Sequence, residues 1–147
     1  MPPPSNLYLF GYNSLQAFGW AIAIFRILSN FISTGSFYGG YASAGDLICL
    51  LQSVAFLEVI HGAIGLVPSG VVLPLMQWGG RTHFLLAIVR QIDEVQELPA
   101  VFITFLAWSL SEVIFIQSIL PFQIRMYSEY CLYIVREHHL VSCTCRG

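Results

Sequence analysis

The sequence predicts an all-α membrane protein, a multi-pass transmembrane helical bundle with about four spans. Of its residues, 56% are hydrophobic and only 10% are charged, whereas a soluble domain carries roughly 25% charged residues. A mean hydropathy of +0.73 leaves too little polar surface to coat a soluble fold. Several apolar stretches also approach the length of about 20 residues that a spanning helix needs, and Gly/Pro/Ser-rich or charged segments separate them.

The charge balance excludes nucleic acid as a partner. The chain has six basic residues, all arginine, and eight acidic ones. It therefore lacks the basic field that a phosphate backbone requires, and it has no cluster of four or more Lys/Arg to bind anionic lipid headgroups. Membrane lipid remains the expected surroundings of the helices.

The N-terminal region is expected to contain one span and a loop. Its prolines favour an extended lead-in, and because it lacks the basic start of a secretory signal we expect it to stay attached. Residues 15–32 are predicted as the first helix, with Arg26 reaching back to the interface. The Gly/Ser-rich residues 33–46 are predicted as a loop, and Asp46 as the N-cap of the next helix.

The second span is predicted over residues 47–67, followed by a break at Pro68 to Gly70. Residues 71–92 are apolar but are interrupted by Pro74 and by two adjacent glycines. Two alternatives stay open for this segment. It is either a third span with polar groups facing inward, or a short interfacial piece followed by a half-length helix.

The charged residues 90–99 are predicted to be solvated, and residues 100–120 form the last predicted span, in which Glu112 is the single charge. With a cytoplasmic N-terminus, the 33–46 loop lies in the lumen and carries no basic residue. The positive-inside bias favours this orientation, although Arg90 does not fit it. The arginines on the cytoplasmic side are then Arg81, Arg125, Arg136 and Arg146.

Glu58 and His61 are the most informative residues, because they lie within the second span. An ionisable group at that depth costs on the order of 2.5 to 3.5 kcal/mol and is a functional candidate by default. Three positions apart, they share one helix face and can line a common cavity. The alternative is that they pair with each other, or with Arg81, to hold the bundle together.

Gln77 and Arg81, at positions i and i+4, present an amide and a guanidinium on one side of the segment that follows. Arg81 could bind a phosphate or a carboxylate of a ligand bidentately, or it could form an ion pair with Glu58 or Glu112. Glu112 is a candidate general acid or base, although one carboxylate does not name a reaction. A small transporter with a proton path through Glu58, His61 and Glu112 is a further alternative.

No metal or cofactor is expected. His138, His139, Cys143 and Cys145 are too loosely spaced for a convincing metal site, and Cys49 lies inside an apolar span, so no disulfide framework is implied. The chain contains no H-E-x-x-H, no G-x-S-x-G and no nucleotide-binding glycine motif.

Three motifs in order carry a family resemblance: LEVIHGAIGLVPS at 57–69, QWGGR at 77–81 and WSLSEVI at 108–114. With them the chain resembles, from about residue 7 to residue 114, the very-long-chain (3R)-3-hydroxyacyl-CoA dehydratases, the protein tyrosine phosphatase-like or Pasticcino-type proteins. The resemblance implies a six-helix lyase of the endoplasmic reticulum membrane. Such a lyase removes water from 3-hydroxyacyl-CoA to give trans-2-enoyl-CoA in very-long-chain fatty-acid elongation, beside the other elongase-complex membrane proteins.

The resemblance also implies a catalytic Tyr and Glu in a segment R-Y-x-x-F-x-x-L-Y-P-x-G-x-x-x-E, for which this chain has no matched position. Phe115 and Ile116 stand where the family has Arg-Tyr. Tyr130 and Glu137 have the spacing of the catalytic pair but lack the Pro and Gly that follow the family's tyrosine, so we interpret them as a coincidence.

We therefore expect a membrane region over 1–120 and a divergent tail over 121–147 without an assigned domain. A tail of this kind would come from an alternative transcript, a retained intron, a frame change or a faulty gene model. The alternative to a dehydratase is a non-catalytic membrane interaction protein or an inactive truncated isoform.

Overall fold

The computed structural model describes residues 4–68, 70–116, 125 and 128. Within them the regular elements are helical, which confirms the predicted all-α bundle. They are α1 (Pro4–Thr34), α2 (Gly40–Val54), α3 (Phe56–Ala63), α4 (Val72–Thr82), the π-helix η1 (His83–Val89) and α5 (Asp93–Gln96). A further helix runs over Pro99–Ile116.

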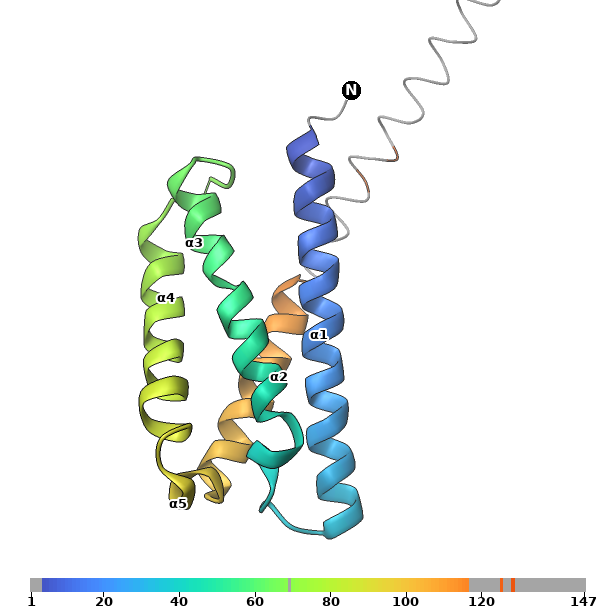
Figure 1. Ribbon diagram of the computed structural model, residues 1–147. Coiled ribbons are helices and arrows are strands. Elements are labelled where there is room, and N and C mark those ends of the chain that lie inside the picture. Colours follow the sequence, from blue (N-terminus) through green and yellow to red (C-terminus); the bar gives the residue numbers. More distant parts are fainter. Residues whose placement is uncertain (1–3, 69, 117–124, 126–127, 129–147) are drawn as a thin grey trace, which may run out of the picture.

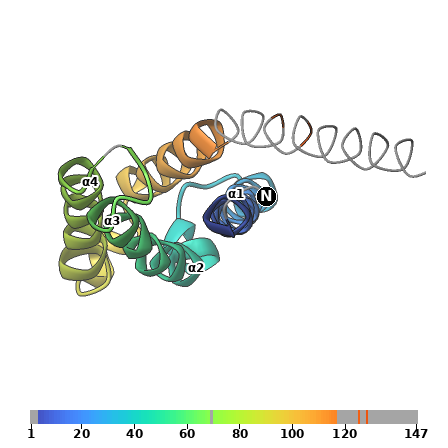
Figure 2. The same ribbon diagram turned by 90° about the horizontal axis from the view of Figure 1, so that it is seen from above.

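The helices run alternately up and down (Figure 1). The long α1 forms one side, α2 and α3 return beside it, α4 and η1 descend on the other side, and the Pro99–Ile116 helix rises again. Seen from above, α2 and α3 lie between α1 and α4 (Figure 2). The largest fully buried side chains come from α1, α2, η1 and the Pro99–Ile116 helix: Trp20, Ile27, Ile48, Leu85, Val89, Val101 and Phe105.

Three helices in the described part are long and apolar enough to cross a membrane: Ser5–Thr34, Gly40–Ala63 and Pro99–Ile116. The fourth expected span, over 71–92, is not among them. It is nevertheless helical over 11 residues in α4 and a further 7 in η1. At a rise of about 1.5 Å per residue, α4 and η1 together are nearly as long as the hydrocarbon core of a bilayer is thick, about 30 Å. Their length is therefore compatible with a span, and the insertion of this segment stays a prediction.

The predicted start of the first helix is wrong. Helix α1 begins at Pro4 and not near residue 15, so residues 4–14 are helical where an extended lead-in was expected. Proline is compatible with the first turn of a helix, where a missing N–H breaks no intrahelical bond. The consequence for function is that Tyr8, Tyr12 and Gln16 share one helical face.

The predicted loop over 33–46 is also largely wrong, because α2 already begins at Gly40 and includes Asp46, which therefore does not cap it. The turn that precedes α2 depends on Gly39, which has a φ of +80°. A Cβ on Gly40 would lie 3.3 Å from Cβ of Phe102. Glycine at position 40 thus lets the first turn of α2 pack closely against the Pro99–Ile116 helix.

The two ends of the bundle are closed by turns. The break predicted at Pro68 to Gly70 lies in the turn between α3 and α4, where Gly65 and Gly70 have φ values of +72° and +69°. At the other end, the backbone N–H of Gly39 donates to Oε2 of Glu97 at 3.0 Å. This bond ties the α1–α2 turn to the exposed 90–99 segment.

Candidate functional site

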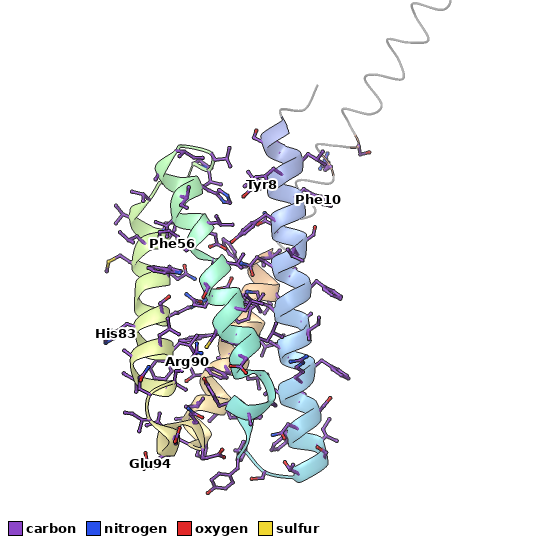
Figure 3. All side chains as sticks on the ribbon, viewed as in Figure 1. Tyr8, Phe10, Phe56, His83, Arg90 and Glu94 are labelled. Atoms are coloured by element: carbon purple, nitrogen blue, oxygen red, sulfur yellow. The ribbon has the colours of Figure 1, made fainter. Side chains whose placement is uncertain are left out.

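A polar cluster forms where the N-terminal half of α1 faces α3. The hydroxyl of Tyr12 donates a hydrogen bond to Oε1 of Glu58 at 3.2 Å. The hydroxyl of Tyr8 and Nε2 of His61 are 3.0 Å apart and form a second hydrogen bond. Figure 3 shows Tyr8 on the side of α1 that faces α3. Glu58 and His61 therefore share a face, as predicted, but each has its own tyrosine partner.

The rings of this cluster are packed edge to face. The His61 ring is perpendicular to those of Tyr8 and Tyr12, with centroid distances of 5.3 and 5.2 Å. His61 is only 4% exposed. Aromatic edge-to-face contacts at such distances are favourable, so the imidazole is fixed by packing as well as by its hydrogen bond.

Gln16 orients Tyr12 from one helical turn further along α1. Its Nε2 donates to the Tyr12 hydroxyl at 3.1 Å and to the carbonyl oxygen of Leu51 at 3.5 Å. The Tyr12 hydroxyl thus accepts from an amide and donates to a carboxylate. Among the described residues, the buried Oε1 of Gln16 has no hydrogen-bond partner.

A second charged group lies between α4 and the last described helix. Arg81 and Glu112 form an ion pair in which the side chains are 17% and 14% exposed. The guanidinium carbon lies 5.4 Å from the centroid of the Trp108 ring, within the range of a cation–π contact. Of the alternatives considered for Arg81, the structure thus shows the ion pair with Glu112.

These two groups border a common recess of about 20 Å³. Glu58, Gln77, Arg81 and Glu112, which the sequence singled out as candidates, all line it. His61 does not, although it packs on Tyr12, which binds Glu58. The other lining residues are Trp20, Gln52, Ala55, Pro74 and Trp78.

A larger cavity of about 250 Å³ adjoins the recess, and the two share Gln52 and Trp78. These residues bind each other reciprocally. Nε1 of Trp78 donates to the Gln52 carbonyl at 3.0 Å, and Nε2 of Gln52 donates to the Trp78 carbonyl at 3.3 Å. The remaining lining residues of the cavity are Cys49, Ser53, Phe56, Thr82, Leu85 and Leu86.

Sequence reasoning missed Tyr8, Tyr12 and Gln16 as members of the cluster. Their spacing of four was a usable signal, since it gives one helix a stripe of polar groups. The signal was lost because the first helix was predicted to begin too late. Ser109 and Ser111, which precede Glu112, bond to carbonyls of their own helix and take no part in the recess.

Part of the sequence interpretation lies outside the described residues. This applies to Tyr130 and Glu137, and to the loose metal set of His138, His139, Cys143 and Cys145. Within the described residues, no group of three or more His, Cys, Asp or Glu side chains could hold a metal ion.

Comparison with known proteins gives a consistent result. Residues 52–135 match the family described as "Protein tyrosine phosphatase-like protein, PTPLA". This match includes part of the segment after Ile114, and the domain boundary near residue 120 stays a prediction. No solved structure matches the chain significantly.

Individual relatives carry the name very-long-chain (3R)-3-hydroxyacyl-CoA dehydratase. The human dehydratase 2 is 31% identical over 140 residues, covering 90% of this chain and 55% of the human protein. The mouse dehydratase 2 is 32% identical over 112 residues, covering 76% of this chain and 44% of the relative. A zebrafish dehydratase is 32% identical over 108 residues, which cover 72% of this chain and 30% of the zebrafish protein.

The chain thus spans about half the length of the human relative, or less of the others. The family match covers more than half of the 147 residues of this chain. It includes the second span from residue 52 on, the α4 segment with Gln77 and Arg81, and the helix with Glu112. The chain belongs to the protein tyrosine phosphatase-like (PTPLA) family.

Proposed function

We propose that this chain binds, in the membrane, very-long-chain 3-hydroxyacyl-CoA, the substrate that its family dehydrates to trans-2-enoyl-CoA. The observation that carries the proposal is the convergence of Glu58, Gln77, Arg81 and Glu112 on one recess between apolar helices. The names of the relatives supply the substrate class. The endoplasmic reticulum membrane and elongase-complex proteins are part of the same proposal, as its location and partners.

The recess suits one uncharged polar group of such a substrate at a time, since a volume of about 20 Å³ has room for roughly one water-sized group. It contains two carboxyl groups and one guanidinium, and that guanidinium is already paired with Glu112. It therefore offers no excess positive charge for a phosphate, whereas hydroxyl and thioester groups need only hydrogen bonds. Among the described residues, Oε2 of Glu58 and the Gln77 amide make no hydrogen bond, so both are open to a ligand.

Each polar residue then has a distinct role. Glu58, oriented by Tyr12, accepts the hydrogen bond of the 3-hydroxyl group, and Gln77 donates to the thioester carbonyl. Arg81 and Glu112 hold α4 against the last described helix and so set the width of the recess. These are binding and positioning roles, because the family's Tyr/Glu acid–base pair has no matched position in this sequence.

The test compares binding and turnover by the purified chain in lipid nanodiscs. We expect 3-hydroxyoctadecanoyl-CoA to bind more tightly than octadecanoyl-CoA, and Glu58→Gln to remove that difference. A hydrogen bond to a carboxylate is worth about 1.5 to 3 kcal/mol, so the expected loss is about tenfold or more in affinity. The matched control is Glu94→Gln, which changes an exposed carboxylate of α5 outside the recess.

Formation of the trans-2-enoyl product is expected to remain at background. General acid–base catalysis typically contributes about 10² to 10⁴ in rate, and the residues that supply it in the family are unmatched here. If the chain binds neither acyl-CoA, the dehydratase role is rejected and a non-catalytic membrane interaction protein becomes the better account. Liposome ion uptake that disappears in Glu58→Gln would favour the transporter alternative instead.

A further inference from the structure

We infer that the 250 Å³ cavity beside the recess holds the fatty acyl chain of an acyl-CoA, next to the polar groups that bind its hydroxyacyl end. The inference rests on the proposed function and assigns a place in the bundle to the apolar part of the ligand. The cavity opens at the surface of the bundle, where its lining side chains Phe56 and Leu86 are 41% and 36% exposed.

The hydrogen bonds around the cavity favour an apolar occupant. Gln52 donates to the Trp78 carbonyl and to Oγ1 of Thr82, each at 3.3 Å. The Ser53 hydroxyl donates to the carbonyl of Cys49 at 2.8 Å. Because the polar groups of the wall already have protein partners, a ligand gains little from hydrogen bonding there. The rest of the lining is supplied by Phe56, Leu85, Leu86 and the Trp78 ring.

One wall of the cavity is formed by a π-helix, which is an uncommon element. Leu85 and Leu86 belong to the π-helix η1, which follows α4 without a break. π-helical turns are rare, and they occur frequently at functional sites. Here the π-helical turns form part of the cavity wall beside α2.

The position of the cavity selects the kind of ligand. The cavity and the recess share Gln52 and Trp78, so a molecule in contact with both must be apolar at one end and hydrogen-bonding at the other. A membrane phospholipid also has an acyl chain, but the recess offers its phosphate no unpaired cation. A 3-hydroxyacyl thioester carries uncharged oxygens next to its chain, and the recess has room for one such group.

Cys49 provides a direct reporter, because its side chain lines the cavity. In a variant with Cys131→Ser, Cys143→Ser and Cys145→Ser, Cys49 is the remaining thiol of the four in the sequence. The measurement is the rate of Cys49 alkylation by N-ethylmaleimide in nanodiscs. We expect 3-hydroxyoctadecanoyl-CoA to slow this rate about tenfold at saturation, and coenzyme A alone to leave it unchanged.

A filling substitution tests the cavity independently of the thiol. Ser53→Phe places a ring in the cavity and is expected to lower acyl-CoA affinity about tenfold, by removing the space for the chain. The matched control is Ser111→Phe, since Ser111 is also exposed and also bonds to a carbonyl of its own helix but does not line the cavity. Retained helicity of both variants, measured by circular dichroism, excludes misfolding as the cause.

The failures of the two proposals are distinguishable. If 3-hydroxyoctadecanoyl-CoA binds while Cys49 alkylation and the Ser53→Phe variant are unaffected, the cavity assignment is overturned and the proposed function stands. If octadecyl lysophosphatidylcholine protects Cys49 as well as the acyl-CoA does, the occupant is membrane lipid and the assignment to acyl-CoA is overturned. If no acyl-CoA binds, both proposals fail.

Discussion

At the scale of single residues, Tyr12 connects the parts of the polar cluster. Its hydroxyl binds both Gln16 and Glu58, and its ring packs on His61. A phenol that accepts one hydrogen bond and donates another has its hydrogen placed by its neighbours. This arrangement orients Glu58, which lines the recess, through a hydrogen bond from a neutral phenol.

The substitution Tyr12→Phe removes the hydroxyl group and keeps the aromatic ring. Glu58 then loses its donor and the Gln16 amide loses an acceptor, at an expected cost of about 2 kcal/mol in the free energy of unfolding. Thermal unfolding in detergent micelles measures this cost. Tyr38→Phe, at a position that is 63% exposed, is the control and should be near neutral. Equal stability of the two variants would contradict the assigned role of Tyr12.

The Arg81–Glu112 pair predicts non-additive mutations. Removing either partner leaves the other charge largely buried, at a cost of about 3 kcal/mol or more. Replacing both, in Arg81→Met with Glu112→Leu, should cost less than the sum of the single changes, because no charge is left unpaired. A double-mutant cycle on unfolding free energies measures the coupling. Strict additivity would show that the ion pair does not contribute to stability.

At the scale of elements, the turn between α3 and α4 depends on a close backbone approach at Gly62. A Cβ at Gly62 would lie 2.2 Å from the carbonyl oxygen of Gly70, whereas nothing lies within 4 Å of a Cβ at Gly11. The same substitution in two helices should therefore have opposite effects. Position in the bundle, and not helix propensity, decides the sign.

We expect Gly62→Ala to destabilise the protein by about 1 to 3 kcal/mol, because the turn must shift to make room. Gly11→Ala should be neutral or stabilising by up to about 1 kcal/mol, since alanine favours the helix. Unfolding midpoints of the two variants in the same micelles are the measurement. A stable Gly62→Ala protein would refute the close packing of α3 against the turn.

At the scale of the whole molecule, the alternating helices predict the topology. If α4 and η1 cross the membrane, the 35–39 turn and α5 lie on one side and the α3–α4 turn on the other (Figure 1). The measurement is the labelling of single cysteines by a membrane-impermeant maleimide added to sealed vesicles. The cysteines are introduced one at a time, in an otherwise cysteine-free chain, at Ser36, Leu66 and Glu94. Labelling of Leu66→Cys and Glu94→Cys from the same side would mean that α4 and η1 do not cross.

The sequence predictions were right where the signal is local and wrong where tertiary packing decides the structure. The helical class, the existence of a second span and the break near Pro68 were predictable, because long apolar runs and Gly/Pro breaks are local signals. The bounds of that span were wrong, since the helix covers Gly40–Ala63 and not 47–67. The start of α1 and the start of α2 were not predictable. Pro4 is compatible with a first helical turn, and α2 begins at Gly40, which lies close to Phe102 of the Pro99–Ile116 helix.

The sequence by itself determined that this is an apolar helical protein with ionisable groups inside its spans, because composition and hydropathy depend on residue type alone. Only the tertiary structure decided the partners: Arg81 with Glu112, Tyr12 with Glu58, and Tyr8 with His61. Each pair joins residues from different helices. Which residues meet is set by how the helices pack, a long-range property that local sequence patterns do not contain.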